Sequence, residues 1–261
     1  MKTIILNEKN LSIVQQNSEP AVMALGFFDG VHKGHQQVIL AARKKAQKKG
    51  LKLAVMSFFP HPKTVFSNEE VDYLMPMEKK GESFRSLGVD LFYIVDFTKS
   101  FAALQPRQFV QQYLVGLQVQ YAVAGFDYTY GTKGAGTIDT IESDSEGKIK
   151  VDVVKRFAIS GEKVSSTCIR KKLKQGYVEE VTALLGKPYS IQYSMKHGLH
   201  VYYTLPERGE YYVTILVGKR AISQKIYVKN ERYITFHHDL NIEDCSIYFH
   251  QRATQKDQEI S

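Results

Sequence analysis

The strongest constraint on the fold is the alternation of two hydrophobic periods along the first two thirds of the chain. Short β-branched or apolar runs alternate with longer helical patterns, which is typical of a parallel sheet whose strands are joined by helices. The pattern predicts strands over 21–27, 52–59, 91–97, 120–126 and 150–157, and helices around 34–48, 77–87 and 106–116. We therefore expect an α/β fold in this part of the chain.

The pattern changes after Gly186. Just before it, "VSSTCIRKKLKQG" and "YVEEVTALLG" predict two helices, the first with a hydroxyl cap, and Gly176 and Gly186 as their ends. From Lys187 onward the chain alternates in short aromatic-rich runs, namely "YSIQYS", "HVYYTL", "EYYVTILV", "QKIYVK", "RYITFH" and "CSIYFH". Such runs indicate an antiparallel sheet or a small barrel. We predict two domains, residues 1–186 and residues 187–261.

Composition narrows the partners. A formal charge of +8 suits nucleic acid, an anionic membrane surface or phosphorylated small molecules, but the basic residues are scattered and do not interleave with aromatics, so we expect no nucleic-acid partner. No run approaches the roughly 20 apolar residues of a membrane span, so we expect a cytoplasmic protein with no membrane partner. Cys168 and Cys245 are far apart and should be free thiols. The sequence indicates no oligomeric state.

The stretch "GFFDGVHKGHQQVI" (26–39) stands where the first buried strand should give way to a helix. A helix beginning near Val31 or His32 would direct free N–H groups and its positive dipole end at an anion. His32 and His35 would lie on one face of that helix and reach the same phosphate. Glycines permit positive φ or close approach of a ligand, and they stand at positions 26, 30 and 34. Taken alone, the motif could also be a surface turn.

A second phosphate-binding element is expected in "GEKVSSTCIRKKL" (161–173). Hydroxyl groups at a helix start can hold the β- and γ-phosphates of a nucleotide, while Lys163 and Arg170 can neutralise departing pyrophosphate. The hydroxyl residues are Ser165, Ser166 and Thr167. The alternative is an ordinary capped helix.

Together, "GFFDGVHKGHQ" and "KVSSTCIR" resemble the HxGH nucleotidyltransferase superfamily, and more narrowly the FMN adenylyltransferase (FAD synthetase) module of prokaryotic riboflavin kinase/FAD synthetases. "SFFPHPKTVF" (57–66) and "GFDYTYGTKGAG" (125–136) resemble the F-x-P-H-P and glycine-rich segments of that family. The resemblance covers about residues 1–185. It implies a Rossmann-like parallel-sheet nucleotidyltransferase domain followed by a small antiparallel β-barrel-like domain. Phe27 departs from the family, many of whose members have Asn there.

The resemblance also implies a reaction and a set of residues. FMN would attack the α-phosphorus of ATP, giving FAD and pyrophosphate, with Mg²⁺ bound to the phosphates and no metal site built from the protein alone. The implied catalytic residues are His32, His35 and Arg170. The implied nucleotide-binding residues are Gly26, Phe27, Asp29, Gly30, Gly34, Lys163, Ser165, Ser166 and Thr167. The implied flavin-binding residues are Pro60, His61, Pro62, Phe66, Asp127 and Tyr128.

The second domain departs from the family. In two-function relatives it resembles a riboflavin kinase barrel with a P-T-A-N segment that holds Mg-ATP, and this segment is missing between "KPYSIQYS" and "LPERGEYYVTI". We therefore predict a shortened domain without riboflavin kinase activity. The alternatives are a bifunctional enzyme that retains the kinase and a non-catalytic flavin or nucleotide sensor.

Overall fold

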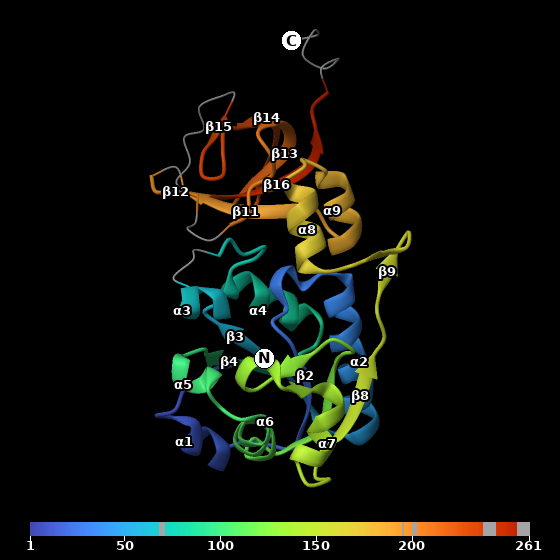
Figure 1. Cartoon of the computed structure of the whole chain (residues 1–261). Coiled ribbons are helices and arrows are strands. Elements are labelled where there is room, and N and C mark those ends of the chain that lie inside the picture. The colour runs from blue at the N-terminus through green and yellow to red at the C-terminus, as the bar shows by residue number, and fades with distance from the viewer. Residues whose placement is uncertain (68–70, 195, 200–202, 237–243, 255–261) are drawn as a thin grey trace. The chain divides into compact units, whose positions relative to one another are not determined.

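The computed structural model describes residues 1–67, 71–194, 196–199, 203–236 and 244–254. The chain forms two compact units, each built from separate stretches (Figure 1). The first unit comprises Met1–Phe28, Gly34–Val71 and Met77–Phe157, and the second comprises Asp29–Lys33, Asp72–Pro76 and Ala158–Ser261. The domain division at residue 186 stays a prediction drawn from the sequence pattern.

In the described part of the first unit, six strands form a wholly parallel sheet in the order β1-β4-β3-β2-β5-β8. The strands are β1 Lys2–Leu6, β2 Ala21–Leu25, β3 Lys52–Phe59, β4 Leu91–Asp96, β5 Val119–Gly125 and β8 Lys150–Val154. All five residues of β2 are buried, as expected for a strand covered on both faces. The predicted α/β class is confirmed.

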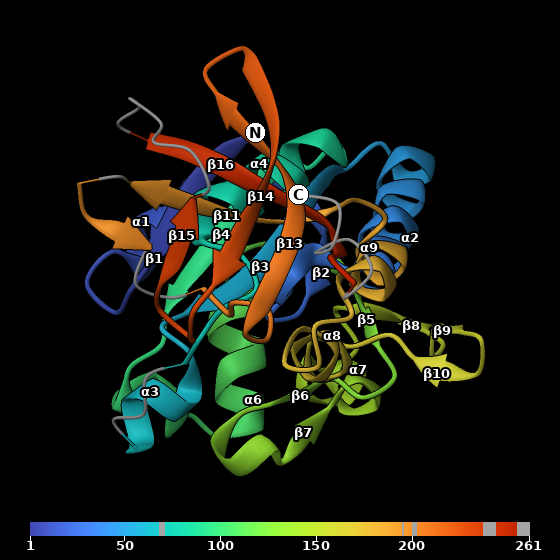
Figure 2. The same ribbon diagram turned by 90° about the horizontal axis from the view of Figure 1, so that it is seen from above.

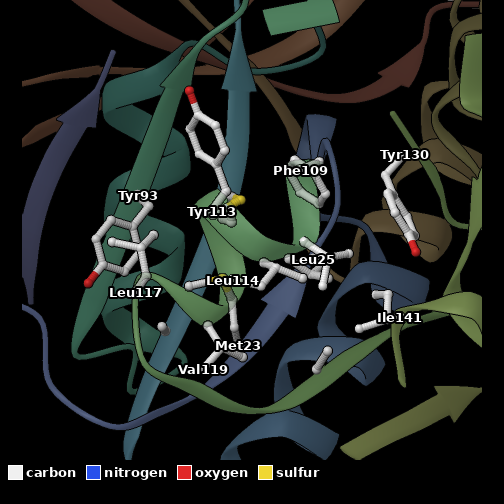
Figure 3. Close-up of a cluster of buried hydrophobic side chains, with 14 of the residues drawn as sticks. Met23, Leu25, Tyr93, Phe109, Tyr113, Leu114, Leu117, Val119, Tyr130 and Ile141 are labelled. Carbon is white, nitrogen blue, oxygen red and sulfur yellow. The ribbon is translucent and has the colours of Figure 1, made fainter. Parts of the chain in front are cut away.

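Helices cover both faces of this sheet. Lys45 of α2 (Lys33–Lys49) contacts the ring of Tyr121, whose side chain lies on one face. The buried residues of this helix are Val38, Ile39, Ala42 and Ala46. Phe84 of α4 (Met77–Ser86) packs on Phe92 of the same face. The opposite face receives α6 (Pro106–Phe109) and the π-helix η2 (Val110–Val115), whose aromatic rings fill the cluster in Figure 3.

The other elements of the first unit are short. They are α1 Leu11–Gln16, α3 Pro62–Ser67, α5 Lys99–Ala102, α7 Ile141–Asp144, the 3₁₀ helices η3 Thr132–Gly134 and η4 Ile138–Thr140, and the hairpin of β6 Thr129–Tyr130 and β7 Gly136–Thr137. The predicted helix over 106–116 is present, but its second half is a π-helix, in which backbone hydrogen bonds span five residues rather than four.

The second unit holds an antiparallel six-stranded sheet among its described residues, in the order β12-β11-β16-β13-β14-β15, and it curls into part of a barrel (Figure 2). Its strands are β11 Tyr189–Ser194, β12 Gly198–Leu199, β13 Gly209–Val217, β14 Arg220–Val228, β15 Ile234–Phe236 and β16 Asp244–Arg252. This confirms the predicted antiparallel sheet. The strand expected at "HVYYTL" falls partly on residues 200–202, which lie outside the described residues, and Tyr203 forms only an isolated bridge with Tyr73.

Two α-helices, one 3₁₀ helix and a short two-stranded ribbon belong to the same unit. They are α8 Ser166–Leu173, α9 Val178–Leu185, η1 Asp29–Val31 and the strands β9 Ala158–Ile159 and β10 Glu162–Lys163. The predicted caps are confirmed, because the Ser165 hydroxyl accepts a bond from the Cys168 N–H at 3.2 Å and Gly186 ends α9 with φ of 80°. Cys168 and Cys245 are free thiols.

Candidate active site

The strand order of the first unit marks one edge of the sheet as the place for a ligand. The chain leaves β2 for β3 on one side and later adds β5 on the other side, so the order reverses at β2. Ligands of open parallel sheets bind outside the carboxyl ends of the strands at such a switch point. The predicted segments 26–39, 57–66 and 125–136 contain the residues that directly follow these three strands, namely 26–28, 60–62 and 126–128.

Phe27 connects two of these segments within the first unit. Its ring meets the ring of His61 edge to face, with centroids 4.8 Å apart. Its carbonyl oxygen accepts hydrogen bonds from Ser57 Oγ at 2.8 Å and from Lys80 Nζ at 2.9 Å. The same Nζ lies 4.8 Å from the centre of the Phe27 ring. The turn after β2 and the loop after β3 are thereby fixed to each other.

The other predicted flavin-binding residues fall into two groups. Pro60 and Pro62 are half-buried beside His61, whereas Phe66 of α3 keeps 64% of its surface exposed. Asp127 is exposed at the end of β5, and Tyr128 beside it packs on the ring of Tyr130. These side chains leave aromatic and apolar surface at the sheet edge, which suits a planar ring ligand.

Tyr128 carries a buried polar atom. Its hydroxyl oxygen is buried and has no hydrogen-bonding partner in the described part of the chain. Burial, followed by the neighbouring Tyr130, raises the pKa of the Tyr128 phenol, so it stays protonated near neutral pH. A buried hydroxyl without a partner is costly, and a bound ligand could supply the missing hydrogen bond.

His35 lies in the first turns of α2, half-buried, and its ring packs edge to face on Phe28 with centroids 5.3 Å apart. Phe28 itself is 1% exposed. Gly26 is required by this packing, because a Cβ there would come within 2.9 Å of the Phe28 ring. Gly34 precedes His35 in the same helix.

The start of α2 differs from the prediction. The helix begins at Lys33, so His32 precedes it and does not share a helical turn with His35. The physical reason lies in two left-handed residues, Gly30 with φ of 77° and Val31 with φ of 43°, which form the end of η1 and interrupt the helix. His32 is 4% exposed and belongs to the second unit.

The second unit brings the two predicted phosphate motifs into contact. Asp29, only 1% exposed, forms an ion pair with the guanidinium of Arg170. Its backbone carbonyl accepts a hydrogen bond from Ser166 Oγ at 2.9 Å. Both of its carboxylate oxygens lie 3.1 Å from the Leu74 N–H. The first motif is therefore bonded directly to the start of α8.

The remaining residues of the second motif lie around the same helix start. Ser165 is the N-cap, Thr167 in the first turn is exposed, and Lys163 is half-buried in β10. Lys172 of the same helix forms two ion pairs, with Glu180 and Glu162 lying 2.6 and 2.9 Å from its Nζ. These two carboxylates raise the lysine pKa.

Sequence reasoning missed Lys80, Ser57 and the segment Asp72–Pro76. A signal for Lys80 was present, because this lysine stands four residues before Phe84 and so lies on the apolar face of a predicted helix. It is 1% exposed. The segment Asp72–Pro76 offered no comparable signal, since its importance comes from contacts with residues far away in the sequence.

No helix in the described residues is both long and apolar enough to span a membrane. Nor do three or more His, Cys, Asp or Glu side chains gather as a metal site within the described ranges.

The chain combines a parallel sheet, the motif of residues 26–39 after strand β2 and the motif of residues 161–173 at the start of α8. Together these features define a nucleotidyltransferase of the HxGH type. The family model for FAD synthetase matches residues 14–168, and a bifunctional riboflavin kinase/FMN adenylyltransferase of Listeria monocytogenes is 37% identical over 281 residues. That alignment covers 96% of this chain and 89% of the relative. The chain belongs to the FAD synthetase family.

Two further proteins are similar to this chain over most of its length. A protein named FAD synthetase, also from Listeria monocytogenes, is 29% identical over 233 residues, covering 83% of this chain and 94% of that protein. A crystal structure described as a macrolide-efflux protein from Streptococcus pneumoniae is 26% identical and covers 97% of this chain and 100% of its own, with a TM-score of 0.84. Both are similar to this chain over most of their length.

Proposed function

We propose that the protein transfers the adenylyl group of ATP to FMN, producing FAD and pyrophosphate. The observation that carries the proposal is the junction in the second unit, where Asp29 of the first motif receives Arg170 and Ser166 of the second. The junction orients the Arg170 guanidinium and the backbone N–H groups at the start of α8, and such donors are suited to binding phosphate groups. Membership of the FAD synthetase family supports the choice of FMN as acceptor.

The reaction requires that the FMN phosphate and the α-phosphorus of ATP be aligned, and it does not require a strong base. A phosphate oxygen of FMN forms a bond to the α-phosphorus of ATP while the bond from that phosphorus to the bridging oxygen breaks, and the electron pair leaves with pyrophosphate. The FMN phosphate is already largely ionised near neutral pH. In-line alignment and stabilisation of developing charge therefore account for catalysis.

Membership of the FAD synthetase family supports the following assignment of residue roles. We assign His32 and His35 to the α- and β-phosphates, and Arg170 to the charge on the leaving pyrophosphate. The helix start of α8 supplies Lys163, Ser165, Ser166 and Thr167 to the terminal phosphates. Asp29 holds the Arg170 guanidinium in place, while Gly26, Phe27, Gly30 and Gly34 give the turn its shape.

The flavin would bind at the sheet edge of the first unit. Phe27 and His61 present an aromatic pair fixed by Lys80 and Ser57, and Pro60 and Pro62 flank it. Phe66 is exposed and free to cover a ring, and Asp127 and Tyr128 stand at the end of β5. The buried Tyr128 hydroxyl would gain a hydrogen-bonding partner from the ligand.

Mg²⁺ fits this arrangement as part of the nucleotide. The described residues do not gather into a cluster of carboxylates or imidazoles, and Mg²⁺ is commonly held by substrate phosphates and water with few protein ligands. When bound, the ion would neutralise phosphate charge. The phosphate-binding residues named above would hold the nucleotide that carries it.

We further propose that the protein lacks riboflavin kinase activity. The P-T-A-N segment is missing from the sequence. The alignment with the bifunctional relative is 281 positions long, but this chain has only 261 residues, of which 96% are aligned. The relative therefore has residues at aligned positions where this chain has none. The similarity to a protein named FAD synthetase over 94% of that protein's length supports the same reading.

A chromatographic assay tests both proposals. Purified protein is incubated with ATP and Mg²⁺, in parallel with FMN and with riboflavin, each oxidised and reduced. We expect FAD from FMN and no FMN from riboflavin. Formation of FMN would overturn the loss of the kinase and favour the bifunctional alternative. Product from neither flavin would overturn the transferase assignment and favour a flavin or nucleotide sensor.

A further inference from the structure

The segment Asp72–Pro76 joins two parts of the second unit that are distant in sequence. On one side it contacts the phosphate motifs. The Leu74 N–H donates to the Asp29 carboxylate at 3.1 Å, and the Asp72 carbonyl oxygen accepts from Arg170 Nε at 3.1 Å. Leu74 is 2% exposed and lies against Gly30, where an added Cβ would come within 3.0 Å of its side chain. The segment thus supports both Asp29 and Arg170.

On its other side the segment is bonded to the chain that leads into the antiparallel sheet. The Thr204 N–H donates to the Tyr73 carbonyl at 3.0 Å, and Thr204 Oγ1 donates to the Asp72 carbonyl at 3.1 Å. Tyr203 forms a parallel bridge with Tyr73, and both rings are buried. Thr204 is therefore fixed to two consecutive carbonyl groups of the segment.

Thr204 is in turn fixed from within the sheet. The hydroxyl of Tyr189 in β11 donates to the Thr204 carbonyl at 2.6 Å. Burial raises the pKa of the Tyr189 phenol well above its ordinary value, so the group keeps the proton that it donates. Thr204 itself is only 4% exposed, which protects these hydrogen bonds from water.

One oxygen atom connects the two sides. The Asp72 carbonyl accepts hydrogen bonds from both Arg170 and Thr204. We propose that Thr204 is a positioning residue for adenylyl transfer, through which the C-terminal sheet orients the Arg170 guanidinium by holding the main chain of Asp72 and Tyr73. This inference rests on the proposed function. It gives the shortened domain a role in the transferase reaction that does not depend on riboflavin kinase activity.

The inference has a specific kinetic consequence. Arg170 would act on ATP and on pyrophosphate, whereas the flavin-binding residues lie in the first unit. A displaced guanidinium would therefore weaken ATP and pyrophosphate binding and leave FMN binding unchanged. General destabilisation of the protein would instead lower the amount of active enzyme and spare both Michaelis constants.

The experiment compares Thr204→Val with Thr204→Ser and with Thr235→Val in the full chain. Valine keeps the shape of threonine but removes the hydroxyl, and serine retains it. Thr235 is the matched control, because its hydroxyl also bonds a main-chain carbonyl in the antiparallel sheet, that of Tyr227. Circular dichroism of each variant checks the fold, and pyrophosphate binding is measured by titration calorimetry.

For Thr204→Val we expect about a fivefold to tenfold rise in the KM for ATP and in the Kd for pyrophosphate. This is the effect expected from the loss of one buried hydrogen bond. The KM for FMN should not change, Thr204→Ser should restore the wild-type values, and Thr235→Val should match the wild type. Unchanged ATP and pyrophosphate constants in a folded Thr204→Val variant would overturn the inference, as would an equal rise in the FMN constant. Wild-type protein that makes no FAD would overturn the proposed function instead, and pyrophosphate calorimetry would still decide the role of Thr204.

Discussion

The substitution Asp29→Asn tests the junction between the two phosphate motifs. Asparagine has the shape of aspartate and keeps one oxygen for the Leu74 N–H, but it removes the negative charge that faces Arg170. Removing one partner of a fully buried ion pair costs about 3–5 kcal/mol. The side chain of Asp29 is 1% exposed but that of Arg170 is 26% exposed, so solvent screens part of the loss. We expect the free energy of unfolding to fall by about 2–3 kcal/mol.

Urea unfolding without nucleotide, followed by circular dichroism, measures this change. Arg170→Gln and the double variant complete a mutant cycle, in which we expect a coupling of more than about 1 kcal/mol because the two side chains are in direct contact. Glu82→Gln is the control, since both side chains of the Glu82–Lys79 ion pair are more than a third exposed and the loss of the pair should leave the unfolding curve unchanged. A loss below about 0.5 kcal/mol for Asp29→Asn would refute the reasoning that the pair is buried and coupled.

Three further predictions concern the residues around the motifs. His35→Ala should lower the turnover of FAD synthesis by about 100- to 1,000-fold with an unchanged circular dichroism spectrum, and near-normal turnover would contradict the phosphate assignment. Gly30→Ala should lower the thermal stability more than Gly161→Ala does. Both glycines have φ near 80°, but of the two only Gly30 has a neighbouring side chain that an added Cβ would crowd. Equal losses of thermal stability would rule out this crowding. Lys80→Met should lower the free energy of unfolding by about 1–3 kcal/mol, because it removes the hydrogen bonds of Lys80 to the Phe27 carbonyl and the Ser57 hydroxyl. Lys79→Met should not, because the Lys79 side chain is more than a third exposed, and equal shifts of the two urea midpoints would contradict this.

Much of the fold could be predicted because its strands carry their own signal. The predicted strand over 52–59 matches β3 in both bounds, since a strand buried on both faces is a continuous apolar run. The strand β1 was missed. It is short, it lies at the edge of the sheet with Ile5 61% exposed, and its partner β4 lies far along the chain. Local patterns do not contain such a pairing.

The candidate site was predictable in composition but only partly in geometry. Asp29 contacts Arg170 and Ser166, so the two segments that the sequence assigned to phosphate binding are in direct contact. The left-handed backbone of Val31 was not foreseeable, because β-branched residues avoid that conformation unless tertiary contacts impose it. The same holds for Thr204, whose contacts with Asp72 depend on the folded chain.

The strand order also bears on how the protein is made. A ribosome releases β1 long before β4, the strand beside which β1 lies, because β4 ends at Asp96. At about 5–20 residues per second, β1 waits roughly 5 to 20 seconds for this neighbour during translation. β2 can pair with β3 well before then. The sheet would therefore grow outward from its middle, and a nascent chain stalled before Asp96 would carry β1 as an unpaired strand.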